Sequence, residues 1–247
     1  MSAPGRPDRS RHDEPTLDEA QQRWNDFVDA IGHELRTPLT SIIGFQELLE
    51  DGIYGQLPET GRGALVRIGN SAQELLALLN GMVDLARPAQ APPELDLEDL
   101  PLDGVIADAI ETGRRLAPDR DVRWSAEPAS GLGTIRTDAR RLQRALFLAI
   151  LAAVRATPGG DIHLSVEPID ATGGGGAMLR LQGAVLERVP RPPLADIILD
   201  RPHEGADRSL LRLSLAVDTL ALLGCTVDLE PGPPATLLVR LRSAPKP

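Results

Sequence analysis

A histidine and a glutamate stand side by side in the stretch FVDAIGHELRTPLTSIIGFQELLED, which begins at residue 27. The apolar residues around them recur every three or four positions, which is typical of one face of an amphipathic helix. At about 100° per residue, His33 lies nearly opposite that apolar face and points toward water. An imidazole can act as a nucleophile when an adjacent base activates it, and Glu34 is placed to be that base.

The face that carries His33 also carries small and polar residues, which leave room for another protein to approach: Asp26, Asp29, Thr37, Thr40 and Gly44. Pro38 interrupts the same helix. It has no N–H, so the carbonyl of Glu34 loses its helical partner and the helix is expected to bend there. The lost hydrogen bond and the bend cost stability, and no packing benefit is evident. Such a cost beside an exposed His-Glu pair indicates a functional site.

Two other kinds of chemistry fit the sequence poorly. The zinc motif H-E-x-x-H needs a second histidine where this chain has Thr37. The remaining histidines (His12, His163 and His203) are isolated, and a cysteine cluster is missing. The serine-hydrolase motif G-x-S-x-G is also absent. We therefore expect no metal and no bound cofactor in this chain.

Composition narrows the function further. The chain has 247 residues, a net charge of -10 and only 2% aromatic residues, so its core must be aliphatic. The acidic balance argues against nucleic acid as a partner. A single cysteine, Cys225, fits a reducing compartment. No apolar run approaches the roughly 18 residues of a membrane span, so we expect a cytoplasmic protein without a membrane partner.

The organisation along the chain predicts four segments. Residues 1–16 are a polar tail, residues 17–88 form an antiparallel helical hairpin, residues 89–94 are a proline-rich linker, and residues 95–243 alternate between helix and strand patterns. Within this last segment, helices are expected at residues 102–116 and 138–156, and a strand at residues 177–186. The hairpin leaves apolar stripes on both helices. Leu65, Ile68, Ala72, Leu75, Leu79, Met82 and Ala86 form the stripe of the second helix. Two copies would bury these stripes in a four-helix bundle, so a homodimer is expected.

The run HELRTPL, followed by a second helix and a linker, resembles the dimerisation and phosphoacceptor domain of bacterial histidine kinases. The resemblance covers residues 17–88. It implies that His33 is phosphorylated, that Glu34 is a general base or orients the imidazole, and that Thr37 positions a water when a receiver is dephosphorylated. It explains Pro38 as the helix bend of the family. Asp26, Asp29, Thr40 and Gly44 would then form a face on which a receiver docks.

The rest of the chain resembles the ATP-binding domain of the same family, but the residues that handle nucleotide are changed. Leu148 and Ala152 occupy the positions of asparagines, one of which binds Mg²⁺ in the family. The segment Gln182–Ala184 lacks the aspartate of D-x-G-x-G, and SLLRLSLAV replaces the glycine-rich G-x-G-L-G-L. Triphosphate binding needs metal ligands and close backbone approach, so the fold is expected to persist without the nucleotide site.

The predicted fold class is α+β: a helical hairpin that forms a dimeric four-helix bundle, followed by an α/β sandwich like a degenerate histidine-kinase ATPase domain. The leading hypothesis is a histidine phosphotransferase, similar to ChpT-type proteins, that relays phosphoryl groups between receiver-domain aspartates through His33. Mg²⁺ would belong to the receiver. A pseudokinase scaffold or phosphatase is the alternative, and an active kinase with a divergent ATP site is disfavoured by the missing residues.

Overall fold

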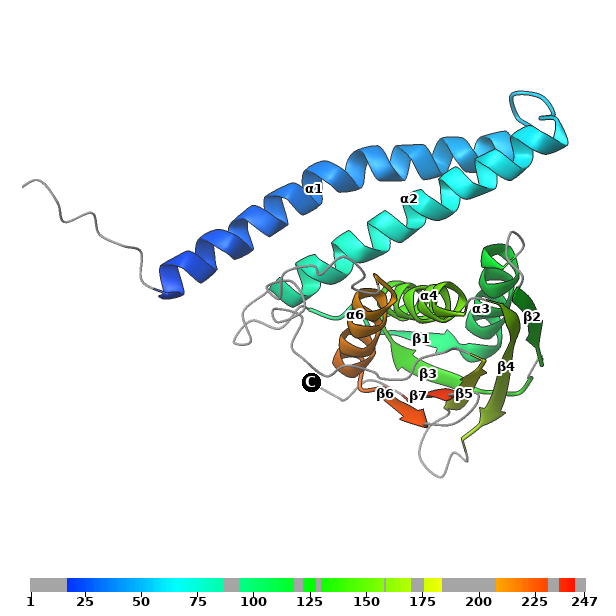
Figure 1. Ribbon diagram of the computed structural model, residues 1–247. Helices are drawn as coiled ribbons and strands as arrows, with labels where there is room; N and C mark the ends of the chain where they lie inside the picture. The colour runs from blue at the N-terminus through cyan, green and yellow to red at the C-terminus, as the bar shows by residue number, and fades with distance from the viewer. Residues whose placement is uncertain are drawn as a thin grey trace, which may run out of the picture.

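The computed structural model describes residues 17–86, 94–117, 122–127, 130–157, 159–169, 176–183, 208–230 and 236–242. The predicted tail (residues 1–16) and all of the predicted linker except Glu94 lie outside these ranges. The described part falls into a long helical hairpin and an α/β domain beneath it (Figure 1).

Two long antiparallel helices form the hairpin, α1 (Leu17–Glu50) and α2 (Glu59–Ala86). Helix α1 continues through Pro38 as one curved helix rather than breaking there (Figure 1). The connection between the helices uses Gly52 and Gly55 at φ angles of 73° and 102°, a region that favours glycine because it lacks a Cβ atom. The hairpin predicted from the apolar spacing is therefore present.

The α/β domain contains three described helices and seven strands in the order β1 (Glu98–Pro101), α3 (Leu102–Leu116), β2 (Val122–Ala126), β3 (Thr134–Thr137), α4 (Ala139–Ala156), β4 (Gly160–Pro168), β5 (Ala177–Gln182), α6 (Arg208–Leu222), β6 (Thr226–Glu230) and β7 (Thr236–Leu241). No described helix is both long enough and apolar enough to cross a bilayer.

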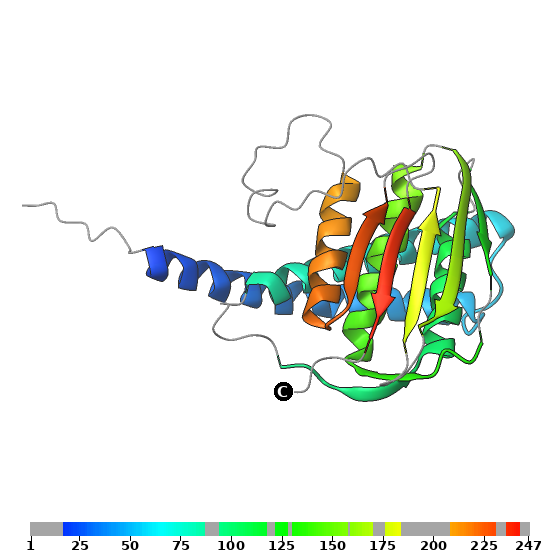
Figure 2. The same cartoon turned by 90° about the horizontal axis from the view of Figure 1, so that it is seen from below.

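Five strands form the main sheet in the order β2-β4-β5-β7-β6. Only β2 and β4 run parallel, and the other neighbours are antiparallel. Strands β1 and β3 form a separate antiparallel pair. Figure 2 shows the sheet in front of α3, α4 and α6, so the domain has one layer of strands and one of helices.

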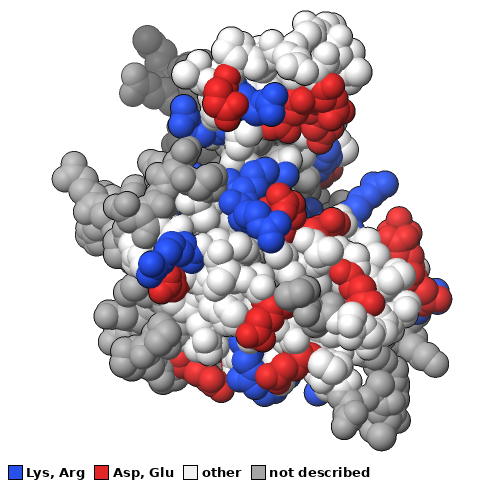
Figure 3. Space-filling model, turned by 90° about the vertical axis from the view of Figure 1, so that its right-hand side faces the viewer, with Lys and Arg blue, Asp and Glu red and all other residues white. Residues whose placement is uncertain are grey.

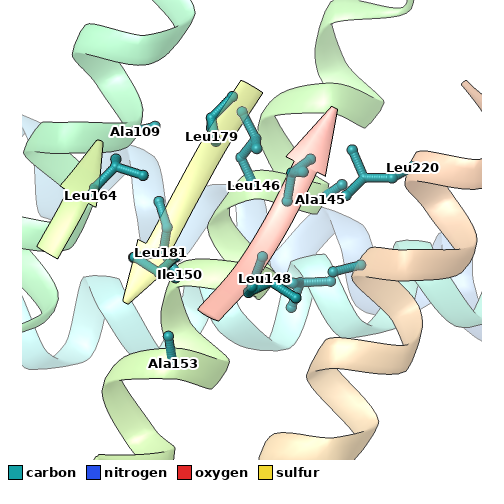
Figure 4. Packing of buried hydrophobic residues seen from close by; sticks show 14 of the residues in the cluster. Ala109, Ala145, Leu146, Leu148, Ile150, Ala153, Leu164, Leu179, Leu181 and Leu220 are labelled. Carbon is teal, nitrogen blue, oxygen red and sulfur yellow. The ribbon is translucent and has the colours of Figure 1, made fainter. Parts of the chain in front are cut away.

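Aliphatic side chains fill the space between these layers, as the low aromatic content predicts. Helix α4 contributes Leu146, Leu148 and Ile150, which face strand residues such as Leu179 and Leu181 (Figure 4). Each of these side chains is at most 4% exposed. An aliphatic core of this kind gains about 25 cal/mol for each Å² of apolar surface removed from water.

Helix α2 has three different faces. Leu65, Ala72 and Leu79 are buried, and the latter two pack with Leu39 of α1. Ala77, Leu78 and Met82 join the core of the α/β domain. Ile68 and Leu75 stay about half exposed. The apolar stripe predicted as one seam therefore divides between three surroundings, because α2 has a neighbour on two sides.

Candidate functional site

His33 is exposed on α1 and faces a groove between the hairpin and the α/β domain. The groove has a volume of about 980 Å³, and helices α1, α2, α3 and α4 all contribute to its walls. Asp29, His33 and Arg36 line it from α1. Arg140 and Phe147 line it from α4, so the walls of one cavity come from both parts of the molecule.

The imidazole of His33 has a defined partner. Arg36, one turn further along α1, places Nη1 3.2 Å from Nδ1 of His33. The same guanidinium donates through Nε and Nη2 to Oδ1 of Asn80, at 3.0 and 2.8 Å. Asn80 belongs to α2, so this contact crosses the hairpin and fixes Arg36 against His33.

The two residues predicted to assist His33 have other surroundings. The Glu34 side chain is exposed, and among the described residues no hydrogen bond or ion pair joins it to His33. The Thr37 hydroxyl donates to the carbonyl oxygen of His33 over 3.5 Å, a long contact within the same helix. The Ser41 hydroxyl donates to the carbonyl of Thr37 at 3.1 Å. Glu34 and Thr37 therefore lie beside His33 without a described bond to its ring.

The face predicted to receive a partner is open. Asp26, Asp29 and Thr40 are exposed, and a Cβ atom added at Gly44 would meet nothing within 4 Å. Asp26 accepts a hydrogen bond from Gln22 at 3.0 Å. Asp29 also lines the groove next to His33. The accessibility of this face is what approach by another protein requires.

The positions that resemble a nucleotide site are apolar or occupied by contacts within the protein. Leu148 and Ala152 are fully buried in the core. Matching the leucines of G-x-G-L-G-L to Leu213 and Leu215 places Arg212 at a glycine position. Arg212 donates from Nε to Glu74 of α2 at 2.8 Å. Among the described residues no group of three His, Cys, Asp or Glu side chains could hold a metal ion.

Further along α2, Asp84 pairs with two arginines of α4. Arg141 Nη2 lies 3.3 Å from Oδ1 of Asp84, and Arg144 pairs with Oδ2. All three side chains are at most 15% exposed. Arg115 of α3 adds a hydrogen bond of 3.3 Å to Gln73 of α2. With Glu74 and Arg212, these contacts attach the α/β domain to the hairpin through buried charges. On the outer surface shown in Figure 3, acidic and basic side chains are instead interspersed.

The shared carboxylate affects the two arginines differently. Burial opposes the charge on Arg141, but Asp84 and Asp138 outweigh burial and raise the pKa of Arg141. Burial lowers the pKa of Arg144 by more than Asp84 raises it. Arg144 therefore relies on Asp84, which it shares with Arg141, to balance its charge. Asp138 caps α4 by accepting from the Arg141 N–H at 3.0 Å, and hydrogen bonds lower its pKa although burial acts in the opposite direction.

Sequence reasoning did not single out Arg36, Asn80 or the ionic contacts between the domains. Arg36 carries a detectable signal, because a residue three positions after His33 lies on the same helical face. Asn80 is an amide within the apolar run LALLNGMV, where a polar residue calls for a partner. The pairing of Glu74 with Arg212 joins residues 138 positions apart and has no local signal.

The hairpin corresponds to a known domain. Residues 23–91 match the family model of the His Kinase A (phospho-acceptor) domain. The N-terminal part of this chain therefore matches a histidine-kinase phosphoacceptor domain, and the chain is similar to histidine kinases over about 60% of its length.

Individual relatives extend this result. The sensor protein DivL of Caulobacter vibrioides is 35% identical over 152 residues, which cover 60% of this chain and 19% of DivL. The cell-division control histidine kinase PdhS of Brucella anthropi is 32% identical over 148 residues, which cover 59% of this chain and 14% of PdhS. This chain thus spans less than a fifth of the length of either relative.

A solved structure agrees on the architecture. The crystal structure of full-length ShkA in complex with AMPPNP aligns with a TM-score of 0.51 and 25% identity, over 90% of this chain and 46% of that chain. The predicted fold class, a helical hairpin followed by an α/β domain that resembles a histidine-kinase ATPase domain, is confirmed.

The buried ion pair between the domains generates a first prediction. Replacing Asp84 with Ala leaves Arg144 without its paired carboxylate and Arg141 with Asp138 alone. Removing one partner of a buried pair costs about 3–5 kcal/mol of stability. The matched control is Glu111→Ala, which removes an ion pair to Arg114 whose side chains are more than 60% exposed. An exposed pair contributes about 0.2–1 kcal/mol. Urea unfolding of both variants provides the measurement, and equal losses of stability would contradict the role of Asp84.

Proposed function

We propose that the chain is a histidine phosphotransferase of a two-component phosphorelay, similar to ChpT-type proteins. His33 takes a phosphoryl group from the aspartyl phosphate of one receiver domain and passes it to the aspartate of another. The observation that carries the proposal is a contrast within one chain. A matched phosphoacceptor domain exposes His33 at a groove, whereas the nearby nucleotide positions Leu148 and Ala152 are fully buried among apolar residues.

Phosphoryl transfer through His33 needs no nucleotide, because an aspartyl phosphate is already activated. An imidazole nitrogen forms a bond to phosphorus while the bond from phosphorus to the aspartate oxygen breaks, and the carboxylate departs with the electron pair. The second receiver reverses these changes with its own aspartate. In-line transfer depends mainly on positioning and on stabilisation of charge, and the Mg²⁺ ion that assists it is supplied by the receiver.

The α/β domain serves as a docking surface in this proposal. Helices α3 and α4 form the wall of the groove opposite His33, and the groove has room for a loop or helix of a receiver. Asp29, Thr40 and Gly44 provide an open approach along α1. The buried ion pairs of Asp84 and Glu74 hold the two parts in one arrangement, which suits a preformed surface.

A homodimer completes the proposed assembly. The exposed large hydrophobic side chains of the described residues all lie on the hairpin: Trp24, Phe27, Ile31, Leu35, Ile42, Phe45, Leu48, Ile53, Tyr54, Ile68 and Leu75. A concentration of exposed apolar side chains on one part of a molecule marks an interaction site. A second hairpin would cover it and produce a four-helix bundle.

A non-catalytic scaffold, or a phosphatase that acts on a response regulator, is the second candidate. The attachment of the α/β domain through buried ion pairs favours a role that depends on binding. The exposed His33 in a matched phosphoacceptor domain favours the phosphotransferase, since a scaffold has no need of an accessible imidazole. An ATP-dependent kinase is the third candidate, and the names of the relatives favour it. The changed nucleotide positions count against it.

Phosphate uptake is the direct test of the relay. The chain is incubated with phosphorylated receiver domains, and acid-labile phosphate on the chain is measured. His33→Gln is expected to abolish uptake while changing stability by about 0.5 kcal/mol or less, since His33 is exposed. His163→Gln in strand β4 is the matched control and should retain uptake. If His33→Gln accepts phosphate at the normal rate, the relay is excluded and the scaffold takes its place.

Nucleotide binding separates the relay from the kinase. Calorimetric titration with Mg-ATP is expected to show no binding at millimolar nucleotide. The double variant Leu148→Asn, Ala152→Asn restores the amides of the family. It should lose stability, because buried amides without partners cost about 1–3 kcal/mol each, and it should gain no affinity. Specific binding in the micromolar range by the unaltered chain would instead support the kinase.

The oligomeric state tests the dimer. Light scattering at micromolar concentration should give twice the 26.5 kDa mass of the chain. Ile68→Glu places a charge on the exposed apolar face of α2 and should yield a monomer, because burying an unpaired charge is unfavourable. Arg62→Glu, at another exposed position of α2, should leave the mass unchanged. A monomeric unaltered chain would remove the bundle from the proposal.

A further inference from the structure

Among the described residues, Arg36 is the polar group in contact with the imidazole of His33, and its position is fixed from outside its own helix. Two of its nitrogens donate to Oδ1 of Asn80 on α2, at 3.0 and 2.8 Å. Its third nitrogen, Nη1, is left to reach Nδ1 of His33 at 3.2 Å. Asn80 thus accepts hydrogen bonds from two nitrogens of the guanidinium, and the third nitrogen points at the histidine ring.

This contact determines where the ring carries its proton. A guanidinium has only donors and stays charged in proteins, so Nδ1 of His33 must be the acceptor. In a neutral imidazole one nitrogen accepts and the other bears hydrogen, so the hydrogen lies on Nε2. Arg36 therefore selects one tautomer, and it also covers Nδ1 against any approaching phosphorus.

We propose that Arg36, held by Asn80, is a positioning residue that keeps Nδ1 of His33 unprotonated and thereby makes the phosphohistidine long-lived. The inference rests on the proposed role of His33 as phosphoacceptor and adds a means of controlling it. The phosphoryl group is carried on Nε2, the ring nitrogen that Arg36 leaves free.

The chemistry of the ring explains the effect. For attack, the lone pair must be on Nε2 and the proton on Nδ1, so the Arg36 contact opens. Nε2 bonds to phosphorus, the bond from phosphorus to the aspartate oxygen breaks, and the Nδ1 proton then passes to water. The neutral phosphoimidazole again has a lone pair on Nδ1, to which Arg36 donates.

For the phosphoryl group to leave, Nδ1 must instead be protonated. Imidazole is a good leaving group when Nδ1 is protonated and a poor one when it is not. Arg36 cannot supply this proton, because a guanidinium does not deprotonate in proteins. While the contact is closed, water therefore removes the phosphoryl group slowly, and transfer to a receiver needs the contact to open.

The tautomer can be measured without phosphate. The full chain is labelled with ¹⁵N in its histidine rings, and His33 is assigned by comparison with His33→Gln. Spectra are recorded about two units above the ordinary imidazole pKa of about 6.5. His33 should show an unprotonated Nδ1 and a protonated Nε2, and Arg36→Ala should move both signals toward those of a solvent-exposed histidine, whose two tautomers exchange. A protonated Nδ1 in the unaltered chain, or identical spectra for the two proteins, would overturn the proposal.

The lifetime of the phosphoryl group is the second measurement. Phosphoramidate phosphorylates histidine directly and replaces the receiver. Loss of phosphate from His33 should be at least about ten-fold faster in Arg36→Ala, the lower bound for loss of one hydrogen bond to a charged group. Asn80→Ala should also accelerate the loss of phosphate, because it removes the acceptor that holds Arg36 in place. Arg36→Lys should restore part of the lifetime, since an ammonium can also donate to Nδ1.

Arg23→Ala removes an exposed arginine of the same helix, away from His33, and is the matched control. It should keep the lifetime of the unaltered chain, and an equal acceleration in Arg23→Ala and Arg36→Ala would refute a specific role for Arg36. Because phosphoramidate stands in for the receiver, failure of the relay leaves both measurements intact. Failure of the Arg36 role leaves uptake from a receiver intact, so the two failures are distinguishable.

Discussion

The carboxylate of Asp84 faces two guanidinium groups in a place from which water is largely excluded. Charges in such surroundings are tolerated only when they are paired, because desolvation of an unpaired ion costs several kcal/mol. Asp84 therefore fixes where Arg141 and Arg144 lie, and through them the first half of α4 on α2. Asp138 reinforces this position, since it both caps α4 and pairs with Arg141. The arrangement of the helical layer, and with it the sheet that packs on α4, follows from these contacts.

Because the two domains are attached, the site at His33 is built from residues of both. The histidine and Arg36 come from α1, Asn80 comes from α2, and the facing wall comes from α3 and α4. A hairpin alone would present His33 on an open helical surface. Attached to the α/β domain, it presents His33 at the side of a groove, so a partner must recognise both parts at once. In the proposed relay, affinity and selectivity for receivers would then depend on residues that take no part in the chemistry.

The elements with strong local signals could be predicted from the sequence. The helices expected at residues 102–116 and 138–156 agree with α3 and α4, where apolar periodicity and the Asp138 cap define the ends. Strands β1 and β3 were not predicted, because each has four residues and pairs only with the other. Strand β5 covers Ala177–Gln182 of the strand expected at residues 177–186, Gly183 follows with a φ of 95°, and residues 184–186 lie outside the described ranges. His33 was recognisable from its motif, whereas the contact of Arg36 with Asn80 depends on how two helices align.

The ion pair between Arg212 and Glu74 limits which residues can replace Arg212. Arg212 stands where the resembled family has a glycine, and its guanidinium pairs with Glu74, whose side chain is 16% exposed. Restoring the glycine alone would leave Glu74 buried without a counter-charge, a penalty of about 3–5 kcal/mol. Mutating Glu74 first would leave Arg212 in the same position. Each of these single mutations therefore costs a large part of the total stability of a domain. Single mutations therefore cannot place glycine at this position without a large loss of stability, so the interface that attaches the two domains also excludes a glycine-rich segment here.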